Sequence, residues 1–254
     1  MKDLFGKAIL DFQTNNFPEN LVTETNISEA DEMSIAYLFR SYNEMPKLEQ
    51  KALQLSKGKV LDVGCGAGSH SLYLQEKGLE VTSIDISENA VKACHLRGLT
   101  NAIVQDILDV DNDPSESEQA KQKFDTILLL MNGTGIFGNL SETSKYLQKL
   151  KSLLTPNGQI LIDSSDIIYM FDEEEDGSKW IALPIQPSAS GPSDGYYGEL
   201  MFTISYKNET ENPFPWLYLD YNTLQNAAHA NGLKCELVLE GEHFDYLAKL
   251  SLHL

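Results

Sequence analysis

Residues Val60 to Gly68 read VLDVGCGAG, an apolar run followed by glycines at alternate positions. The run KVLDV, which starts at Lys59, is typical of a buried parallel strand because it is almost continuously apolar. The residues from Ser69 to Lys77 predict a helix that ends at Gly78, a favourable residue at a helix C-terminus. Glycine adopts positive φ and lets a ligand approach the backbone, so this unit is either a tight structural turn or a ligand-binding loop.

Strands and helices alternate along the chain after this loop. A second helix can begin after Ser87, an N-cap residue, and end before Gly98. A third, amphipathic helix spans Glu142 to Leu154, and the turn TPNG (Thr155 to Gly158) leads into the next strand. The further strands that the sequence predicts are VTSI (Val81 to Ile84), AIVQ (Ala102 to Gln105), FDTILLLM (Phe124 to Met131) and QILID. Strands separated by helix-length segments favour a doubly wound, mostly parallel α/β sheet.

The C-terminal part departs from this alternation. A predicted helix from Thr223 to Ala230 is followed by two strand-like segments, KCELVLE and YLAKLSL. The connection between them, around Gly241 to Asp245, is too short for a parallel crossover. The last two strands therefore form an antiparallel hairpin at the end of the sheet.

Two acidic residues follow neighbouring strands. Asp85 closes the second strand, where a carboxylate can accept hydrogen bonds from both ribose hydroxyls of a nucleotide. Asp106 closes the third strand, where it can accept a hydrogen bond from an adenine amino group. Each acid alone is more often a helix cap or a loop residue. Because open α/β sheets bind ligands at the carboxyl ends of their strands, the two acids together indicate a nucleotide site.

DVGCGAG, Asp85, QDIL and the PNG turn before the fifth strand together resemble the class I S-adenosylmethionine-dependent methyltransferase family. The resemblance covers roughly Val60 to Leu254, and the N-terminal helices are similar to the lid of that family. It implies a seven-stranded sheet whose last strand runs antiparallel, in agreement with the predicted hairpin. It also implies S-adenosylmethionine as the cofactor and S-adenosylhomocysteine as the product.

The resemblance assigns cofactor contacts to the matching positions of this chain. It implies a role for Asp62 at the methionine end, directly or through water. The other contacts that it implies are a loop beneath the methionine and ribose (Gly64, Cys65, Gly66, Gly68), the ribose and adenine side (Asp85, Ile86), the adenine itself (Asp106, Ile107) and the pocket wall after the fourth strand (Met131, Asn132).

A nicotinamide-dependent dehydrogenase is the alternative on a similar fold. Its loop needs a third glycine or alanine where this chain has Ser69. Asp62 inside the strand suits a sulfonium and ammonium ligand better than a pyrophosphate, which favours positive helix dipoles over carboxylates. The sequence therefore favours the methyltransferase.

The composition bears on the methyl acceptor. The 254 residues include 38 acids and 19 basic residues, a formal net charge of −19 that would repel a nucleic acid. The fourth strand ends in MNGTG, whereas related enzymes that methylate amino nitrogens of bases or glutamine carry Asn/Asp-Pro-Pro-Tyr/Phe. We therefore expect a small-molecule acceptor and no nucleic acid. A protein methyltransferase and a catalytically silent, S-adenosylmethionine-binding regulatory protein are the alternatives.

Cysteine usage and hydropathy bear on location. The three cysteines are scattered without a CxxC pair, which predicts a reducing compartment and no metal site. No apolar run approaches the roughly 20 residues that span a bilayer, and the start MKDLFGKAILDFQTNN does not read as a signal peptide. The expected location is cytoplasmic, without membrane association.

We expect one domain over residues 1–254. Its predicted parts are an N-terminal helical lid (1–57), a cofactor-binding core (58–165), an inserted flap (166–216) and a C-terminal helix with the β-hairpin (217–254). In the flap, KWIALPI and GELMFTISY predict a small antiparallel β structure. This flap covers the acceptor or forms a homodimer interface.

The lid carries a candidate ligand for the methionine carboxylate. Two helices are predicted between Ser28 and Leu55, with Arg40 close in sequence to Tyr37 and Tyr42. The planar guanidinium of Arg40 suits a carboxylate. Alternatively, Arg40 is a surface residue that packs its stem on the aromatic rings.

Catalysis of methyl transfer needs in-line positioning more than a catalytic triad. A general base is needed only for a protonated acceptor. The weak candidates are Asn132, Asp166 and Tyr169, just beyond the fourth and fifth strands, although residues of these types in such positions more often have a structural role.

Overall fold

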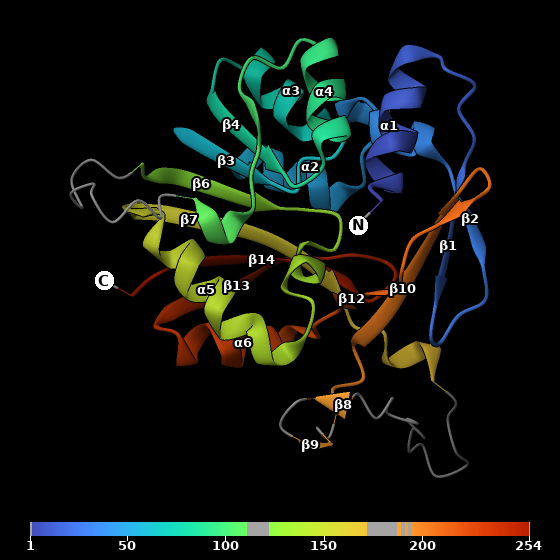
Figure 1. The fold of residues 1–254 in the computed structure, drawn as a ribbon. Helices are drawn as coiled ribbons and strands as arrows, with labels where there is room; N and C mark the ends of the chain where they lie inside the picture. The colour runs from blue at the N-terminus through green and yellow to red at the C-terminus, as the bar shows by residue number, and fades with distance from the viewer. Residues whose placement is uncertain (1, 111–121, 172–186, 189–190, 193–194, 254) are drawn as a thin grey trace.

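The computed structural model describes residues 2–110, 122–171, 187–188, 191–192 and 195–253 (Figure 1). A seven-stranded sheet has the order β13-β14-β7-β6-β3-β4-β5. Its strands are β3 (Lys59–Val63), β4 (Glu80–Asp85), β5 (Ala102–Val104), β6 (Phe124–Leu129), β7 (Leu154–Ser165), β13 (Leu233–Glu240) and β14 (Asp245–Leu252). The first five pair in parallel, and β14 runs antiparallel to both β7 and β13. The predicted fold class and its C-terminal hairpin are confirmed.

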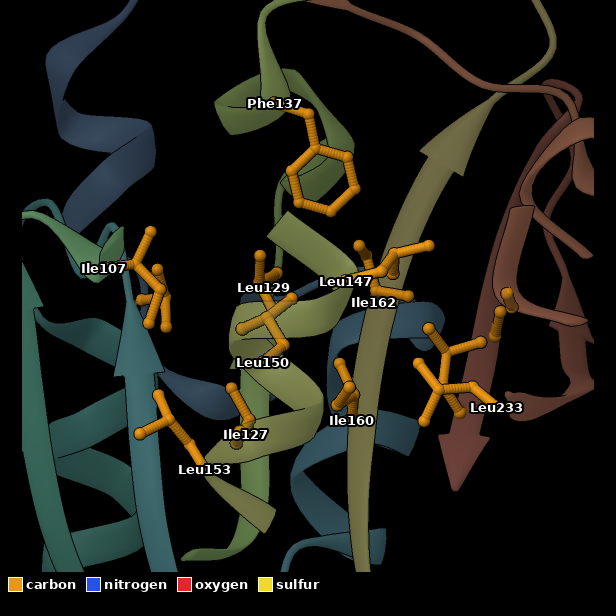
Figure 2. Close-up of a cluster of buried hydrophobic side chains, with 14 of the residues drawn as sticks. Ile107, Ile127, Leu129, Phe137, Leu147, Leu150, Leu153, Ile160, Ile162 and Leu233 are labelled. Atoms are coloured by element: carbon orange, nitrogen blue, oxygen red, sulfur yellow. The ribbon is translucent and has the colours of Figure 1, made fainter. Parts of the chain in front are cut away.

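Helices cover both faces of this sheet. Successive residues of the central strands point to opposite faces, and both faces are apolar. Leu61, Ile127 and Ile160 belong to a buried cluster with the helices of one face, drawn in Figure 2. Val60 and Leu128 belong to a cluster on the other face. The covering helices are α5 (Thr143–Ser152) and α6 (Tyr221–Ala230) on the first face and α2 (Lys47–Leu55) and α3 (Ser69–Glu76) on the second, followed along the chain by α4 (Glu88–Leu96). Figure 1 shows α3 and α4 on the opposite side from α5 and α6.

Two local predictions can be compared directly with the structure. Ser87 caps α4, as predicted, by accepting a hydrogen bond from the Ala90 N–H at 2.9 Å. The prediction of a TPNG turn before the strand is wrong, because β7 already begins at Leu154 and includes these four residues. They lie where the pairing of β7 with β6 shifts register, between Phe124 and Thr126.

A second sheet joins the N-terminal segment to the inserted segment. Its strands are β1 (Leu21–Thr25), β2 (Asp31–Met33), β10 (Glu199–Tyr206), β11 (Glu209–Thr210) and β12 (Phe214–Leu217), in the order β11-β10-β1-β2 with β12 also on β10. Two short strands that pair with each other, β8 (Pro187–Ser188) and β9 (Gly191–Pro192), precede β10 along the chain. The predicted β flap is thus built on β10, whereas KWIALPI lies outside the described residues.

The prediction of two helices between Ser28 and Leu55 is wrong in its first half. That region holds β2 and two short 3-10 helices, η1 (Ile35–Phe39) and η2 (Tyr42–Glu44), and only α2 is an α-helix. A further helix, α1 (Leu4–Thr14), packs on α4 and was not predicted. The strand β1 was not predicted either. It is paired with β10, which lies about 180 positions later in the chain, and no local pattern reveals such a pairing.

Candidate active site

The three glycines after β3 all adopt a left-handed conformation, with φ of 72°, 52° and 78° at Gly64, Gly66 and Gly68. The Gly64 N–H donates to the Ile84 carbonyl at 2.9 Å, which holds the loop against β4. A Cβ at Gly66 would meet nothing within 4 Å, whereas one at Gly68 would lie 2.9 Å from Cys94 Sγ. Gly66 therefore leaves open space for a ligand, and Gly68 permits close packing on α4.

The carboxylate of Asp85 lies against this loop. It accepts hydrogen bonds from the Gly66 and Ser87 N–H groups, both at 2.9 Å. Burial raises the pKa of Asp85, although these two backbone donors oppose the shift. Each oxygen carries one of these bonds, and a carboxylate has about four lone-pair sites, so acceptor capacity remains for ribose hydroxyls. The adjacent Ile86 is 61% exposed, which leaves an apolar side chain free to cover a planar ring.

Asp106 follows β5 beside this site. Strand pairing brings the two chain segments together, since the Gln105 N–H donates to the Asp85 carbonyl at 2.9 Å. The exposed Asp106 carboxylate caps the 3-10 helix η3 (Ile107–Asp109) through the Leu108 N–H at 2.8 Å. The side chain of Ile107 instead points into the core (Figure 2), which leaves its backbone for the predicted adenine contact.

Asp62 is buried under the loop at the end of β3. Its Oδ2 accepts a hydrogen bond from Ser71 Oγ at 2.6 Å, and Ser83 Oγ in turn donates to Ser71 at 2.7 Å. Burial raises the pKa of Asp62, with the Ser71 hydrogen bond opposing the shift. The neighbouring Cys65 is also buried, with its sulfur 4.0 Å from that of Cys94. The predicted role of Asp62 at the methionine end stays a prediction.

The exit of β6 carries backbone strain. Met131 and Asn132 have φ of 67° and 59°, a conformation that is costly for residues other than glycine. The Asp163 carboxylate holds this turn by accepting from the Met131 N–H at 3.0 Å and the Gly133 N–H at 2.9 Å. Burial raises the pKa of Asp163 to about 6. Strained turns cluster at ligand sites, and this one ends a central strand beside the glycine loop.

The three weak catalytic candidates have different surroundings. The side-chain oxygen of Asn132 accepts from Ser164 Oγ at 3.0 Å. Asp166 Oδ1 accepts from the Tyr197 hydroxyl at 2.7 Å. The ring of Tyr169 is half exposed and stacks on Phe244, with 5.2 Å between ring centroids. Asn132 and Asp166 therefore have structural partners, and Tyr169 has a free face.

Arg40 has a partner that the sequence did not indicate. It forms a buried ion pair with Glu49, and its guanidinium lies 3.9 Å from the centroid of the Tyr37 ring. Glu49 also bonds His70 Nε2 at 2.5 Å. Arg40 Nε has no hydrogen-bond partner within the described structure. Its predicted contact with a methionine carboxylate stays a prediction, and would have to be made by a guanidinium already paired with Glu49.

This buried cluster shifts the pKa values of Glu49 and His70 in opposite directions. Burial favours the neutral carboxyl of Glu49, but the hydrogen bond and charge of His70 and the charge of Arg40 outweigh it and lower the pKa of Glu49. Burial likewise opposes the charge on His70, but its hydrogen bond to Glu49 and the charge of Asp62 raise the pKa of His70. Glu49 was not predicted, because its position in α2 gave no signal beyond an ordinary helical acid.

A cavity of about 530 Å³ opens between the second sheet and the end of β7. Ser165 and Tyr169 line it on the side of the large sheet, and Thr23 and Phe202 on the side of the second sheet. It lies at the carboxyl end of a parallel strand, where open α/β sheets bind ligands. Another hollow of about 680 Å³, lined by Tyr42, Tyr73 and neighbours, lies on the outer side of α3.

Comparisons with known proteins identify the family of this chain. A family model described as a methyltransferase domain matches residues 54–191. The crystal structure of an S-adenosylmethionine-dependent methyltransferase from Bacteroides fragilis in complex with S-adenosyl-L-homocysteine is 42% identical, with a TM-score of 0.85. The match covers 100% of this chain and 96% of that one. The fold and the family are those of the class I S-adenosylmethionine-dependent methyltransferases. This chain belongs to that family, as its sequence predicts.

Curated relatives match over shorter regions. A putative methyltransferase, YqeM, of Bacillus subtilis is 29% identical over 107 residues, 42% of this chain and 42% of the relative. A ubiquinone biosynthesis O-methyltransferase of Xanthomonas euvesicatoria pv. vesicatoria is 28% identical over 112 residues, 44% of this chain and 45% of the relative. This chain thus spans less than half the length of these two relatives.

None of the helices in residues 2–110, 122–171 and 195–253 is long and apolar enough to cross a membrane. Within the same ranges, no three His, Cys, Asp or Glu side chains gather as metal ligands would.

Proposed function

We propose that this chain transfers the methyl group of S-adenosylmethionine to a small-molecule acceptor. The observation that carries the proposal is the open space over Gly66, with the Asp85 carboxylate fixed beside it. When bound, S-adenosylmethionine supplies a methyl group already activated by its positive sulfur. The chain contributes binding, orientation and exclusion of water, which can supply much of the rate acceleration.

Each part of the crevice suits one part of that cofactor. Asp85 would hold the ribose hydroxyls, and exposed Ile86 and Asp106 would contact the adenine. The strained turn at Met131 and Asn132, fixed by Asp163, would form the wall near the sulfur. These carboxylates and apolar groups fit a nucleoside with a cationic tail.

Two observations support a small acceptor. The cavity beside the end of β7 has about 530 Å³, within the range of roughly 300–1,000 Å³ that small-ligand pockets occupy. The net charge of −19 disfavours a nucleic acid, which would be repelled.

Cofactor binding tests the first half of the proposal. We expect the purified protein to bind S-adenosylmethionine and S-adenosylhomocysteine in calorimetry, but not NAD. Asp85→Ala should weaken binding by roughly 1–3 kcal/mol, because hydrogen bonds to a charged group are lost. Glu80→Ala is the matched control, since Glu80 lies at the other end of β4 and is exposed. Equal losses in both variants would remove Asp85 from the site.

Acceptor use tests the second half. S-Adenosylhomocysteine formation should be measured with pooled small molecules, with proteins and with RNA. We expect turnover with small molecules, whereas turnover confined to proteins or RNA would contradict the proposed acceptor class. Tight cofactor binding without turnover on any acceptor would favour the regulatory alternative.

A further inference from the structure

The cavity beside the end of β7 has walls from distant parts of the chain. Asp245 and Ser165 lie side by side in the large sheet, at the start of β14 and the end of β7. Thr23 of β1 and Phe202 of β10 belong to the second sheet. The space is therefore formed only when the two sheets are assembled.

Aromatic rings supply much of the apolar lining. Phe202 and Tyr218 stack with 6.4 Å between ring centroids and 24° between planes. Tyr169 stacks on Phe244 at 5.2 Å. Tyr169, Phe202 and Tyr218 all line the cavity. The faces of such rings attract cations, and the attraction grows when the cation is shielded from water.

Carboxylates complete the lining. Glu29, Asp31 and Asp245 all border the cavity, and the described lining residues include one histidine, His243, but no Lys or Arg. None of the three forms an ion pair within the part of the chain that the structure describes. Asp31 and Asp245 each accept one backbone N–H hydrogen bond. Three carboxylates without a cationic partner favour a cationic guest and repel a carboxylate or phosphate.

Tyr218 connects this cavity to the cofactor crevice. Burial raises the pKa of Tyr218 to about 12, with Tyr169 in the cavity and Asp163 under the crevice as further causes. Asp163 is the residue that holds the strained turn at Met131 and Asn132. The preceding residue, Leu217, accepts a hydrogen bond from Asn132 Nδ2 at 3.4 Å, so Tyr218 lines the cavity and directly follows a residue bonded to the strained turn. The Tyr218 hydroxyl has no hydrogen-bond partner within the described structure.

We propose that the methyl acceptor is a small amine, which this cavity binds in its ammonium form between the aromatic rings and the three carboxylates. This inference rests on the proposed function and adds the substrate class to it. The ammonium loses a proton to water before reaction. The nitrogen lone pair then forms the C–N bond while the C–S bond breaks. The electron pair of that bond stays on sulfur, and the positive charge passes to the methylated ammonium product.

Binding measured without turnover tests the charge preference. Calorimetry on the protein saturated with S-adenosylhomocysteine compares phenethylamine with phenethyl alcohol and hydrocinnamate, which share a ring and differ in the end group. Cyclohexylamine and cyclohexanol repeat the comparison without an aromatic ring. We expect each amine to bind at least roughly tenfold more tightly than its alcohol, about 1.4 kcal/mol, and hydrocinnamate not to bind. Equal binding of amine and alcohol, or no amine binding at millimolar concentration, would overturn the inference.

Variants locate the effect in the cavity. The triple variant Glu29→Gln, Asp31→Asn, Asp245→Asn should weaken amine binding roughly tenfold and leave alcohol binding unchanged, because only the charges are removed. Glu19→Gln, Glu76→Gln, Glu240→Gln removes the same charge from exposed positions elsewhere and should have little effect. Equal losses in both triple variants would count against the site. If the cavity variant does not fold, Asp245→Asn alone should still give a several-fold loss.

The controls separate this inference from the proposed function. Binding of S-adenosylhomocysteine should be the same in all variants, since none of the changed residues borders the glycine loop. A wild-type protein that binds S-adenosylhomocysteine and methylates alcohols but not amines would overturn the substrate class alone. A protein that binds no S-adenosylhomocysteine would overturn the proposed function itself.

Discussion

The glycines of the loop after β3 have different neighbours although they share a positive φ. Gly66 faces open space, and Gly68 faces Cys94 and Leu99 of the adjoining segment. Any L side chain pays about 1–2 kcal/mol in this left-handed conformation. At Gly68 a new Cβ would also overpack against α4, which typically adds about 1–3 kcal/mol.

These differences predict that alanine at Gly68 mainly lowers the stability of the protein, whereas alanine at Gly66 mainly weakens cofactor binding. Gly68→Ala should lower the free energy of unfolding by about 2–5 kcal/mol, since strain and overpacking add. Gly66→Ala should lower it by only about 1–2 kcal/mol, but should weaken S-adenosylmethionine binding, because its Cβ enters the space left for the ligand. Urea unfolding and calorimetry measure the two quantities. Undiminished cofactor binding by Gly66→Ala would show that this space is not part of the binding site.

At the scale of elements, the ion cluster of Arg40, Glu49 and His70 joins three of them. Arg40 follows η1, Glu49 lies in α2, and His70 lies in the first turn of α3. All three side chains are at least nine-tenths buried. Ser69 Oγ adds a hydrogen bond to the Leu38 carbonyl of η1 at 2.7 Å. This cluster therefore attaches the N-terminal segment to the helix that begins at the glycine loop.

Removing the central carboxylate should be costly. Glu49→Gln leaves the Arg40 charge buried without its counter-ion, and breaking a buried pair in this way typically costs about 3–5 kcal/mol. Urea unfolding should report this loss near pH 6. Glu44→Gln is the control, because Glu44 is an exposed acid of η2. A loss below about 1 kcal/mol for Glu49→Gln would mean that water compensates the cluster.

The same cluster predicts a pH dependence. The pKa of His70 is raised, so its contribution is complete below its unfolded pKa and is lost as the pH rises through the folded value. The pKa of Glu49 is lowered, so its contribution is present above its unfolded pKa and is lost as the pH falls through the folded value. The stability difference between wild type and Glu49→Gln should therefore be largest between about pH 5 and 6. It should shrink toward alkaline pH without vanishing, since Arg40 stays charged. A difference that grows above pH 7 would contradict this assignment.

At the scale of the whole molecule, the N-terminal segment and the inserted segment form one structure. Thr23 of β1 pairs with Ile204 of β10. The Glu211 carboxylate accepts hydrogen bonds from the backbone N–H groups of Lys2 and Leu4, at 2.9 and 2.8 Å. Leu4 and Ile204 belong to one buried cluster together with Ala90 of α4. The N-terminal segment is thus more than a lid laid over a finished core.

A truncated chain tests this integration. Removing residues 2–33 deletes α1, β1 and β2, and with them the fully buried Leu4, Ile9 and Leu21. Large core side chains contribute about 2–5 kcal/mol each, and a typical domain has only about 5–15 kcal/mol in total. We expect the truncated chain to aggregate or to lack a cooperative urea transition. A monomer in light scattering with a wild-type midpoint would instead identify a detachable lid.

Light scattering on the intact chain also tests the predicted homodimer through the flap. β10 pairs with β1 on one edge and with β11 and β12 on the other. Both edges of β10 are thus used within the chain, so a dimer through strand pairing would have to use β11 or β12, each of which pairs only with β10 among the described strands. The homodimer and the domain boundaries stay predictions.

The sequence by itself determined the features that depend on local chemistry. The apolar strand before Gly64, the glycine loop and the helix after it follow from turn chemistry and periodicity. The hairpin of β13 and β14 follows from a connection too short for any other pairing. The acids Asp85 and Asp106 follow from their places at strand ends, and together these features identified the family, the sheet and the cofactor.

Only the tertiary structure decided what depends on residues far apart in the chain. The pairing of β1 with β10 has no local signal, because a strand at residue 21 reads the same with or without a partner near residue 204. Arg40 is paired with Glu49 and not left unpaired in the crevice, because a buried charge without a partner is costly. The cavity beside the end of β7 exists only where two sheets meet, so its aromatic and acidic lining cannot be read from any one segment. Local patterns determine elements, whereas burial, charge pairing and strand partners are settled by the packing of the whole chain.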